Sequence, residues 1–388
     1  MSIDLVLIGS LASFFSMQNL IKSYDLSPRC SKFTGRYLIE TIKKTRREDK
    51  VWNSSVVIYD AKSVYVNDDN WMAYVFKNVI IQNQFMTTCV DYQRRLMKNN
   101  DNDMVAKYLR NGRLQKKCPT NCLQKTLIIV DTVDFWNWWW VLVTVSSHYT
   151  LLLSILEDIN TENIEILHLA EDGREKKGIK MPLRDIYHVL FSTKGNERLD
   201  KTTKFENVCY SNVVLLPTRE NPSILKNIHH KYDNCISSIM ISFHIFFRRQ
   251  MNLESGKSNK ICWVYRKHKI AITSWQKLRH IPQQDTLISE VGMKTLNFGK
   301  HNSLRDQVDS VNECKLLVGA HGAGLNLAIG MEKPALLELT PGAISNKNAH
   351  NLMTAVNGCV NVVPIQFSKI NTALLKKYIK DTKDKCYL

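Results

Sequence analysis

A glycine-rich turn with a histidine inside it is the segment of this chain best suited to chemistry. Gly319, Gly322 and Gly324 surround His321, and apolar residues lie on both sides of the turn. Glycines let a ligand approach the main chain, and free N–H groups at a helix start can hold a phosphate. A carboxylate farther along, Glu338, can accept hydrogen bonds from ribose hydroxyls. The pattern indicates a nucleotide site, although such a turn also occurs in α/β domains where glycine serves geometry alone.

The apolar segments around the turn predict the elements that must position it. Residues 316–318 suit a strand buried on both faces, and the turn follows directly. A short apolar helix is expected over 325–331, and Pro334 blocks its continuation. A second buried strand is expected over 335–339, with the acid near its end. Strand, glycine turn, helix, strand and acid in this order are typical of a nucleotide site.

Strands and helices alternate along most of the chain, which favours parallel sheets and an α/β fold. The expected strands are 55–59, 74–82, 126–130, 164–169, 212–216, 261–265, 295–298, 315–318, 335–339 and 360–364. The expected helices are a polar one within 98–117, an apolar one that reaches about 156, and those at 181–191 and 235–250. The last of these suits a connection between halves. We therefore expect an N-terminal segment at 1–40 and domains at 41–235 and 236–388.

The motif at 318–325, Val-Gly-Ala-His-Gly-Ala-Gly-Leu, is followed by Leu-Glu-Leu-Thr-Pro at 337–341. Together they resemble the signature block of the glycosyltransferase 61 family. That family includes the β-1,2-xylosyltransferases of plant glycans and animal enzymes that add N-acetylglucosamine to EGF domains or to O-mannose.

Other segments resemble blocks of the same family and occur in the same order. They are an aromatic block at 134–140, a segment with an aromatic residue beside a cysteine at 205–214, and a strand that ends in an arginine at 263–267. A helix with Gln307 precedes the signature, as it does in the family. The resemblance covers about residues 125–365.

The resemblance implies two facing Rossmann-like domains, the GT-B architecture. It implies transfer of a sugar, N-acetylglucosamine or xylose, from a UDP-sugar to a glycan or glycoprotein acceptor. In that reading Gly322, Ala323, Gly324 and Leu325 form the cradle for the donor diphosphate, and Glu338 binds the ribose.

The expected catalytic residues are Arg266, His321 and Asp134. The Arg266 guanidinium would stabilise the leaving diphosphate, with a surface salt bridge as the alternative. His321 either donates to a phosphate oxygen or braces the turn. An inverting transfer needs a base, and Asp134 competes for that role with His148 and Asp172.

Two departures from the family leave an alternative open. Asn137 stands where members carry a histidine, and Lys269 is the nearest substitute for their second arginine. The chain is therefore either a divergent enzyme or an inactive member that binds a nucleotide sugar or a glycan. Asp101 and Asp103 form the one DxD motif, but no apolar strand precedes them. We therefore expect no metal and no cofactor beyond the donor.

The net charge of the chain indicates a different class of partner. The 388 residues carry a formal net charge of +17, with a pI of about 9.3. A basic nucleic-acid-binding protein is thus a second alternative. The basic residues are spread along the chain rather than concentrated on one helix with interleaved aromatics, so we expect no nucleic-acid partner.

The ten cysteines permit disulfides in a secretory compartment. Cys262 and Cys314 lie in apolar contexts and are expected to be buried thiols. The Cys118–Cys122 spacing resembles half of a zinc site, but no second pair lies nearby. Zinc binding is therefore not expected.

The N-terminus is ambiguous. Residues 5–15 are apolar enough for a signal-peptide core, but no lysine or arginine precedes them. A membrane anchor there stays open, and the apolar run at 136–145 fits a buried core helix better than a span. With one glycosylation sequon at Asn53, we expect the lumen of the Golgi or the endoplasmic reticulum.

Overall fold

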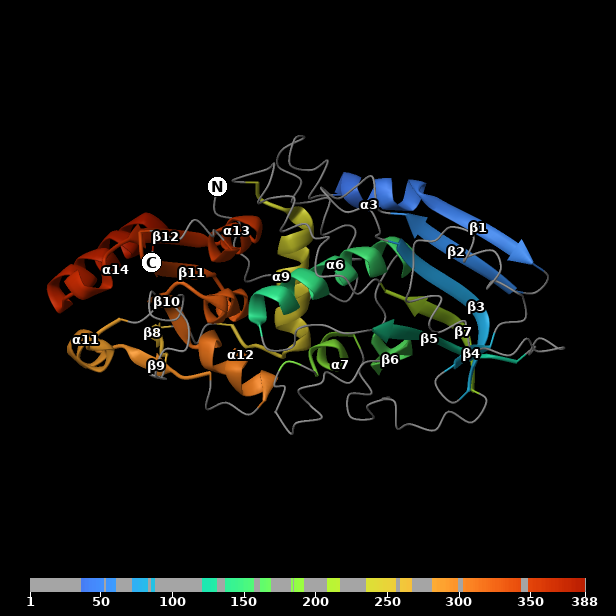
Figure 1. The fold of residues 1–388 in the computed structure, drawn as a ribbon, viewed down its shortest axis with the longest axis horizontal. Coiled ribbons are helices and arrows are strands. Elements are labelled where there is room, and N and C mark those ends of the chain that lie inside the picture. The colour runs from blue at the N-terminus through green and yellow to red at the C-terminus, as the bar shows by residue number, and fades with distance from the viewer. Residues whose placement is uncertain are drawn as a thin grey trace.

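The computed structural model describes most of the sheet and helix framework of the chain. The described residues are 36–51, 54–60, 72–82, 85–87, 121–130, 137–156, 161–168, 183, 185–191, 208–216, 235–255, 259–266, 281–298, 303–342 and 348–387. Among these residues the protein is a mixed α/β structure with two sheets, and α6 and α9 lie between the sheets (Figure 1).

The first sheet combines parallel and antiparallel strands. Its strands are β1 (Arg46–Val51), β2 (Ser54–Asp60), β3 (Met72–Gln82), β4 (Phe85–Thr87), β5 (Leu123–Val130), β6 (Ile164–His168) and β7 (Val208–Leu215). Their order is β1-β2-β3-β7-β5-β6, and β4 pairs with β3. Strand β5 is parallel to both of its neighbours, whereas β1, β2, β3, β4 and β7 are joined by antiparallel pairings. The α/β class is confirmed, but the prediction of parallel sheets holds only for the pairings of β5 in this part.

For the β1–β2 and β3–β4 pairs, the reason is the short chain between the strands. Two residues separate β1 from β2, which leaves no room for the crossover that a parallel pairing needs. Strand β1, Arg-Arg-Glu-Asp-Lys-Val, was not predicted because its sequence is mostly charged. It lies at the edge of the sheet, where charged residues are common.

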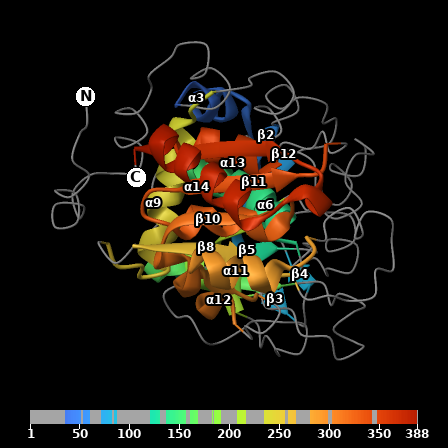
Figure 2. The ribbon, with the colours of Figure 1, turned by 90° about the vertical axis from the view of Figure 1, so that its left-hand side faces the viewer.

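The second sheet is entirely parallel. Its strands are β8 (Lys260–Val264), β9 (Lys294–Leu296), β10 (Cys314–Ala320), β11 (Ala335–Thr340) and β12 (Cys359–Pro364), in the order β12-β11-β10-β8-β9. Helices α12 (Leu304–Asn312), α13 (Asn348–Ala355) and α14 (Thr372–Cys386) pack against it, and α11 (Gln284–Val291) lies beside α14 (Figure 2). The predicted strands of this half are confirmed.

Helix α6 (Trp138–Leu156) is buried along most of its length. It is long and apolar enough to cross a membrane, the one such helix in the described part, but 83% of its most apolar window is buried inside the protein. Its serine and threonine hydroxyls donate to carbonyls within the helix, as from Ser147 to Val143 at 2.7 Å and from Thr150 to Ser146 at 2.9 Å. The prediction of a core helix is confirmed.

The two halves share one apolar core. Helix α9 (Ser238–Gln250) packs against α6, against α7 (Ile186–Phe191) and against the 3₁₀ helix η4 (Ala323–Gly330). Tyr149 on α6 lies 2.6 Å from the Ser242 hydroxyl, and its ring contacts Phe243 and Phe246. The predicted boundary at 235/236 falls in the chain between the two sheets. The predicted N-terminal segment overlaps α3 (Arg36–Lys44), and residues 1–35 lie outside the described residues.

Three disulfides that join described residues tie strands to their surroundings. Cys122–Cys209 joins the start of β5 to β7, Cys262–Cys314 joins β8 to β10, and Cys359–Cys386 joins β12 to α14. Cys262 and Cys314 are therefore not thiols as predicted. They sit on adjacent strands with Cα atoms 5.7 Å apart, which is within bridging range. Disulfides of this number are typical of an oxidising, secreted environment.

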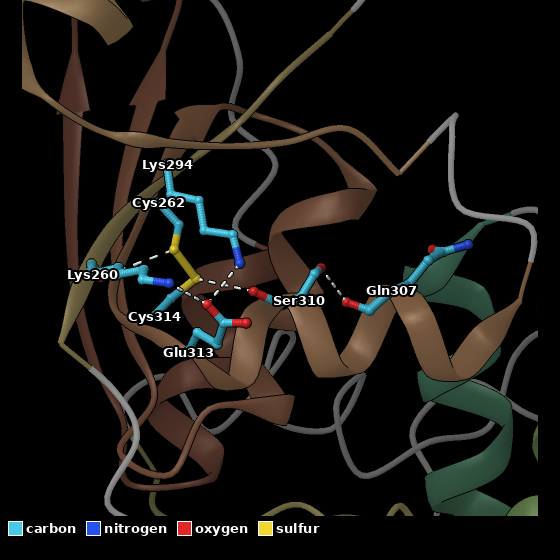
Figure 3. A network of polar contacts seen from close by, with 7 residues as sticks. All are labelled: Lys260, Cys262, Lys294, Gln307, Ser310, Glu313 and Cys314. Carbon is cyan, nitrogen blue, oxygen red and sulfur yellow. Dashed lines mark hydrogen bonds and ion pairs between the residues drawn. A yellow bond between two sulfur atoms is a disulfide. The ribbon is translucent and has the colours of Figure 1, made fainter.

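A charged cluster lies beside the Cys262–Cys314 bridge at the amino ends of these strands (Figure 3). Glu313 accepts hydrogen bonds from the ammonium groups of Lys260 at 2.6 Å and Lys294 at 2.9 Å. These bonds lower the pKa of the Glu313 carboxyl to about 2. The cluster links β8, β9 and the residue before β10 at the end opposite to the glycine turn.

Candidate functional site

The strand order of the second sheet defines where a ligand would bind. Numbered along the chain, its strands run 2-1-3-4-5. Strand β9 therefore lies on one side of β8, and β10, the next strand along the chain, lies on the other side. Ligands of open parallel sheets bind beyond the carboxyl ends of the strands at such a switch point. Arg266 follows β8, and His321 and Gly322 follow β10. Residues predicted from two separate motifs thus meet at the switch point.

Arg266 and Gly322 are in close contact. A Cβ atom added to Gly322 would overlap the Arg266 guanidinium, lying 2.6 Å from its Cζ atom and closer still to Nη2. The arginine can therefore lie over the turn only because residue 322 has no side chain. Buried Gln284, at the start of α11, donates from Nε2 to the Arg266 carbonyl oxygen at 2.6 Å. That bond positions the backbone that carries the guanidinium.

The other two glycines of the turn permit close packing. A Cβ at Gly319 would lie 3.1 Å from Leu325 and 3.2 Å from Val264. One at Gly324 would lie 3.2 Å from the Phe298 ring and 3.4 Å from Val264. Three of these four distances are below 3.4 Å and thus shorter than ordinary side-chain contacts, so geometry alone accounts for these two glycines. Only Gly322 faces a charged group.

The turn backbone offers fewer donors than the predicted cradle. His321 N–H donates to the Leu339 carbonyl at 2.9 Å, and Leu325 N–H donates to the Gly322 carbonyl at 3.0 Å. Within the described residues, the N–H groups of Ala323 and Gly324 make no backbone hydrogen bond. These two groups begin η4, where the first donors of a helix are unpaired. They are available to an anion, whereas the Leu325 amide is engaged and its side chain is fully buried.

His321 and Glu338 form a buried pair behind the turn. His321 Nδ1 lies 2.5 Å from Glu338 Oε1, and the side chains are 5% and 1% exposed. Because a carboxylate accepts, Nδ1 carries the proton, and the bond fixes the orientation of the imidazole. In this structure Glu338 contacts His321, and the ribose contact stays a prediction. The pair supports the bracing role of His321 rather than direct donation to a phosphate.

The remaining candidates are buried in the core or lie outside the described residues. Asp134, the predicted base, lies outside the described residues, as do Asp172 and Lys269. His148 is buried in the core on α6, with Nδ1 2.8 Å from the Tyr187 hydroxyl. Its burial leaves no route for an acceptor sugar.

Asn137, the residue at which the sequence departs from the predicted motif, caps helix α6. Its Oδ1 accepts a hydrogen bond from Trp139 N–H at 3.0 Å, and its carbonyl accepts from Val141 N–H at 3.0 Å. Asparagine is a preferred residue at a helix N-cap because its side-chain oxygen pairs with a donor of the first turn. The departure thus has a local structural reason.

Three residues of the site region were missed by sequence reasoning. Gln284 and Phe298 carry no motif, and Trp138 was recognised only as part of an aromatic block. Trp138 Nε1 donates to Gln307 Oε1 at 2.9 Å, which connects α6 to α12. Only contacts between distant parts of the chain give these residues a role.

Comparison with known proteins leaves the site to be judged on its own geometry. No family model matches the chain, and no curated protein is detectably similar to it. Among the described residues there is no group of three or more His, Cys, Asp or Glu side chains placed to hold a metal.

Proposed function

We propose that this protein is a glycosyltransferase of the glycosyltransferase 61 type, with a GT-B arrangement, that takes its sugar from a UDP-sugar. The observation that carries the proposal is the contact between Arg266 and Gly322 at the switch point of a parallel sheet. A positive fork over the start of a helix fits a diphosphate, because both supply donors to its oxygens.

Each group at the turn has a role in this proposal. The N–H groups of Ala323 and Gly324 bind the diphosphate, and Arg266 neutralises the charge that grows on it as the glycosidic bond breaks. The His321–Glu338 pair holds the turn in position. Asp134 is the proposed base. Because it belongs to the aromatic block before α6, we propose that the acceptor, a glycan or glycoprotein, binds to the first half.

The disulfides and the acceptor class point to the same compartment. Cys122–Cys209, Cys262–Cys314 and Cys359–Cys386 would be stable in the lumen of the endoplasmic reticulum or Golgi, where glycoprotein acceptors are found. We therefore propose a lumenal enzyme. An N-terminal anchor or signal peptide would deliver it there.

Donor binding is the first test. Thermal unfolding is measured with UDP, GDP, UDP-N-acetylglucosamine and UDP-xylose, because a ligand that binds only the folded state raises its stability. We expect a shift with the uridine compounds that is lost in Arg266→Ala. Arg249→Ala is the control, since it removes the same charge from an exposed position on α9. Failure of every nucleotide to shift the wild-type protein would overturn the proposal.

An inactive binding protein is the second candidate, and Asn137 is the observation that favours it. The capping amide replaces an ionisable histidine of the family's aromatic block. Such a protein would bind UDP-sugars without releasing UDP. A coupled assay of UDP release, with and without a mixture of glycoprotein acceptors, separates it from the enzyme.

A further inference from the structure

We infer that Phe298 is the platform on which the nucleobase of the bound nucleotide stacks. The inference rests on the proposed function and names the part of the site that selects a nucleotide over a bare diphosphate. Nothing in the sequence marks Phe298. Its role follows from the strand that places it and from the glycine against which its ring lies.

Phe298 stands at the same edge of the sheet as Arg266. Strand β9 pairs with β8 up to the Val264–Leu296 register, and Tyr265 N–H donates to the Leu296 carbonyl at 2.8 Å. Phe298 follows two residues later, just as Arg266 follows two residues after Val264. Because the strands are parallel, both residues emerge beyond the carboxyl ends, where the ligand is expected.

The Phe298 ring lies against the second half of the glycine turn. A Cβ on Gly324 would meet Cδ2 of the ring at 3.2 Å and Cε2 at 3.3 Å. Phe298 as a whole is only partly buried, so part of the residue is exposed to solvent. Arg266 lies over Gly322, two residues earlier, and two residues of chain span at most about 7 Å. The turn therefore has a cation at one end and an aromatic ring at the other.

This pairing of groups matches the two ends of a nucleoside diphosphate. The phosphates need positive charge and N–H donors, while the base needs an apolar, flat surface. Stacking on an aromatic side chain tolerates every base, since each has a π-face. Arg266 then contributes to binding of any diphosphate, whereas Phe298 contributes only when a base is attached.

The test compares ligands with and without a base. Dissociation constants of UDP and of inorganic pyrophosphate are measured by titration calorimetry for wild type, Phe298→Ala, Phe298→Leu and Phe298→Trp. The leucine variant is the matched control for packing, because it keeps apolar bulk against Gly324 but has no π-face. We expect Phe298→Ala and Phe298→Leu to weaken UDP about tenfold, as loss of one stacked base does. Pyrophosphate affinity should not change, and Phe298→Trp should retain UDP binding.

The outcomes separate this inference from the proposed function. Wild-type affinity for UDP in a folded Phe298→Leu variant overturns the platform and leaves the proposed function standing. Equal weakening of UDP and pyrophosphate also overturns it, because the ring would then act on the turn rather than on the base. A wild-type protein that binds neither ligand overturns both proposals. Thermal unfolding of each variant confirms that it is folded, and Phe298→Leu decides the case if Phe298→Ala is not.

Discussion

Trp138 Nε1 donates a hydrogen bond to Gln307 Oε1 at 2.9 Å, although 169 residues separate them in the sequence. Both side chains are buried. The bond joins the first turn of α6 to α12, the helix that precedes β10. Helix α12 in turn touches the end of η4, where a Cβ on Gly330 would lie 3.0 Å from Val311. One hydrogen bond thus connects the first half to the elements that carry the glycine turn.

Replacing Gln307 by leucine should destabilise the protein more than its small change in size suggests. The substitution leaves the Trp138 indole N–H buried without an acceptor, which costs about 1–3 kcal/mol. Urea unfolding followed by tryptophan fluorescence measures the loss. Adding Trp138→Phe removes the orphaned donor, so the double variant should be more stable than the sum of the two single effects predicts. Additive losses would contradict the importance of this bond.

The second sheet could be predicted closely because its central strands are short and mostly apolar runs. Residues 335–339, for example, match β11, which is buried at every position, to within one residue at each end. Buried parallel strands have this composition because both of their faces are covered. The glycine turn was equally visible, since glycines and a proline mark its limits.

The partners of these elements could not be predicted. Arg266 and Gly322 are 56 positions apart, and only the parallel pairing of β8 with β10 brings them together. The Cys262–Cys314 bridge depends on the same pairing. Phe298 gave no signal because a lone aromatic residue after a three-residue strand fits a core as well as a site. Local patterns predict elements, whereas strand order determines which of their ends meet.

The His321–Glu338 pair predicts a combined effect on stability and binding. Glu338→Ala leaves His321 Nδ1 buried without an acceptor, which should cost about 1–3 kcal/mol of stability and also weaken UDP binding as the turn loses its support. Glu338→Gln keeps an oxygen that can accept from Nδ1 and should lose less of both. Chemical denaturation and UDP titration of the two variants measure this. If Glu338→Ala lost UDP affinity at unchanged stability, a direct ribose contact would be the better account.

Stability should fall in mild acid because of His244. This histidine on α9 is buried with Nε2 3.0 Å from the Met331 carbonyl, so Nε2 donates and the ring is neutral. Burial lowers the pKa of His244 to about 4, helped by the charge of Arg248 and opposed by the bond to Met331. In the unfolded chain the pKa returns to about 6.5.

Because the pKa of His244 is depressed in the folded state, the free energy of unfolding decreases as the pH falls. Between about pH 6.5 and pH 4, His244 is protonated in the unfolded chain but not in the folded protein. The free energy of unfolding therefore decreases by up to about 1.4 kcal/mol per pH unit as the pH falls. His244→Gln keeps a donor for the Met331 carbonyl but does not titrate. Urea unfolding at pH 7 and pH 5 should show a smaller loss in this variant, and an equal loss would locate the acid sensitivity elsewhere.

The disulfide between β8 and β10 should stabilise the folded protein. Cys262 and Cys314 are separated by 52 positions, for which loop-closure entropy corresponds to about 4 kcal/mol. The double variant Cys262→Ala/Cys314→Ala should therefore unfold at a lower temperature, and a reducing agent should lower its unfolding temperature less than that of the wild type. Peptide mapping without reduction verifies the pairing. An unchanged melting temperature would show that the closed loop is already restricted in the unfolded chain.

Arg266 predicts how transfer depends on charge. Because the diphosphate becomes more negative as it leaves, Arg266→Ala should lower kcat more than it weakens UDP-sugar binding. Arg266→Lys should recover only part of kcat, since an ammonium replaces a two-pronged donor.

If the guanidinium and the N–H groups of Ala323 and Gly324 supply the positive potential, activity in excess EDTA should equal activity with manganese. Because we propose an inverting transfer, an α-linked UDP-sugar should give a β-linked product. Activity that disappears in EDTA and returns with manganese would instead assign the leaving-group charge to a metal and return attention to Asp101 and Asp103.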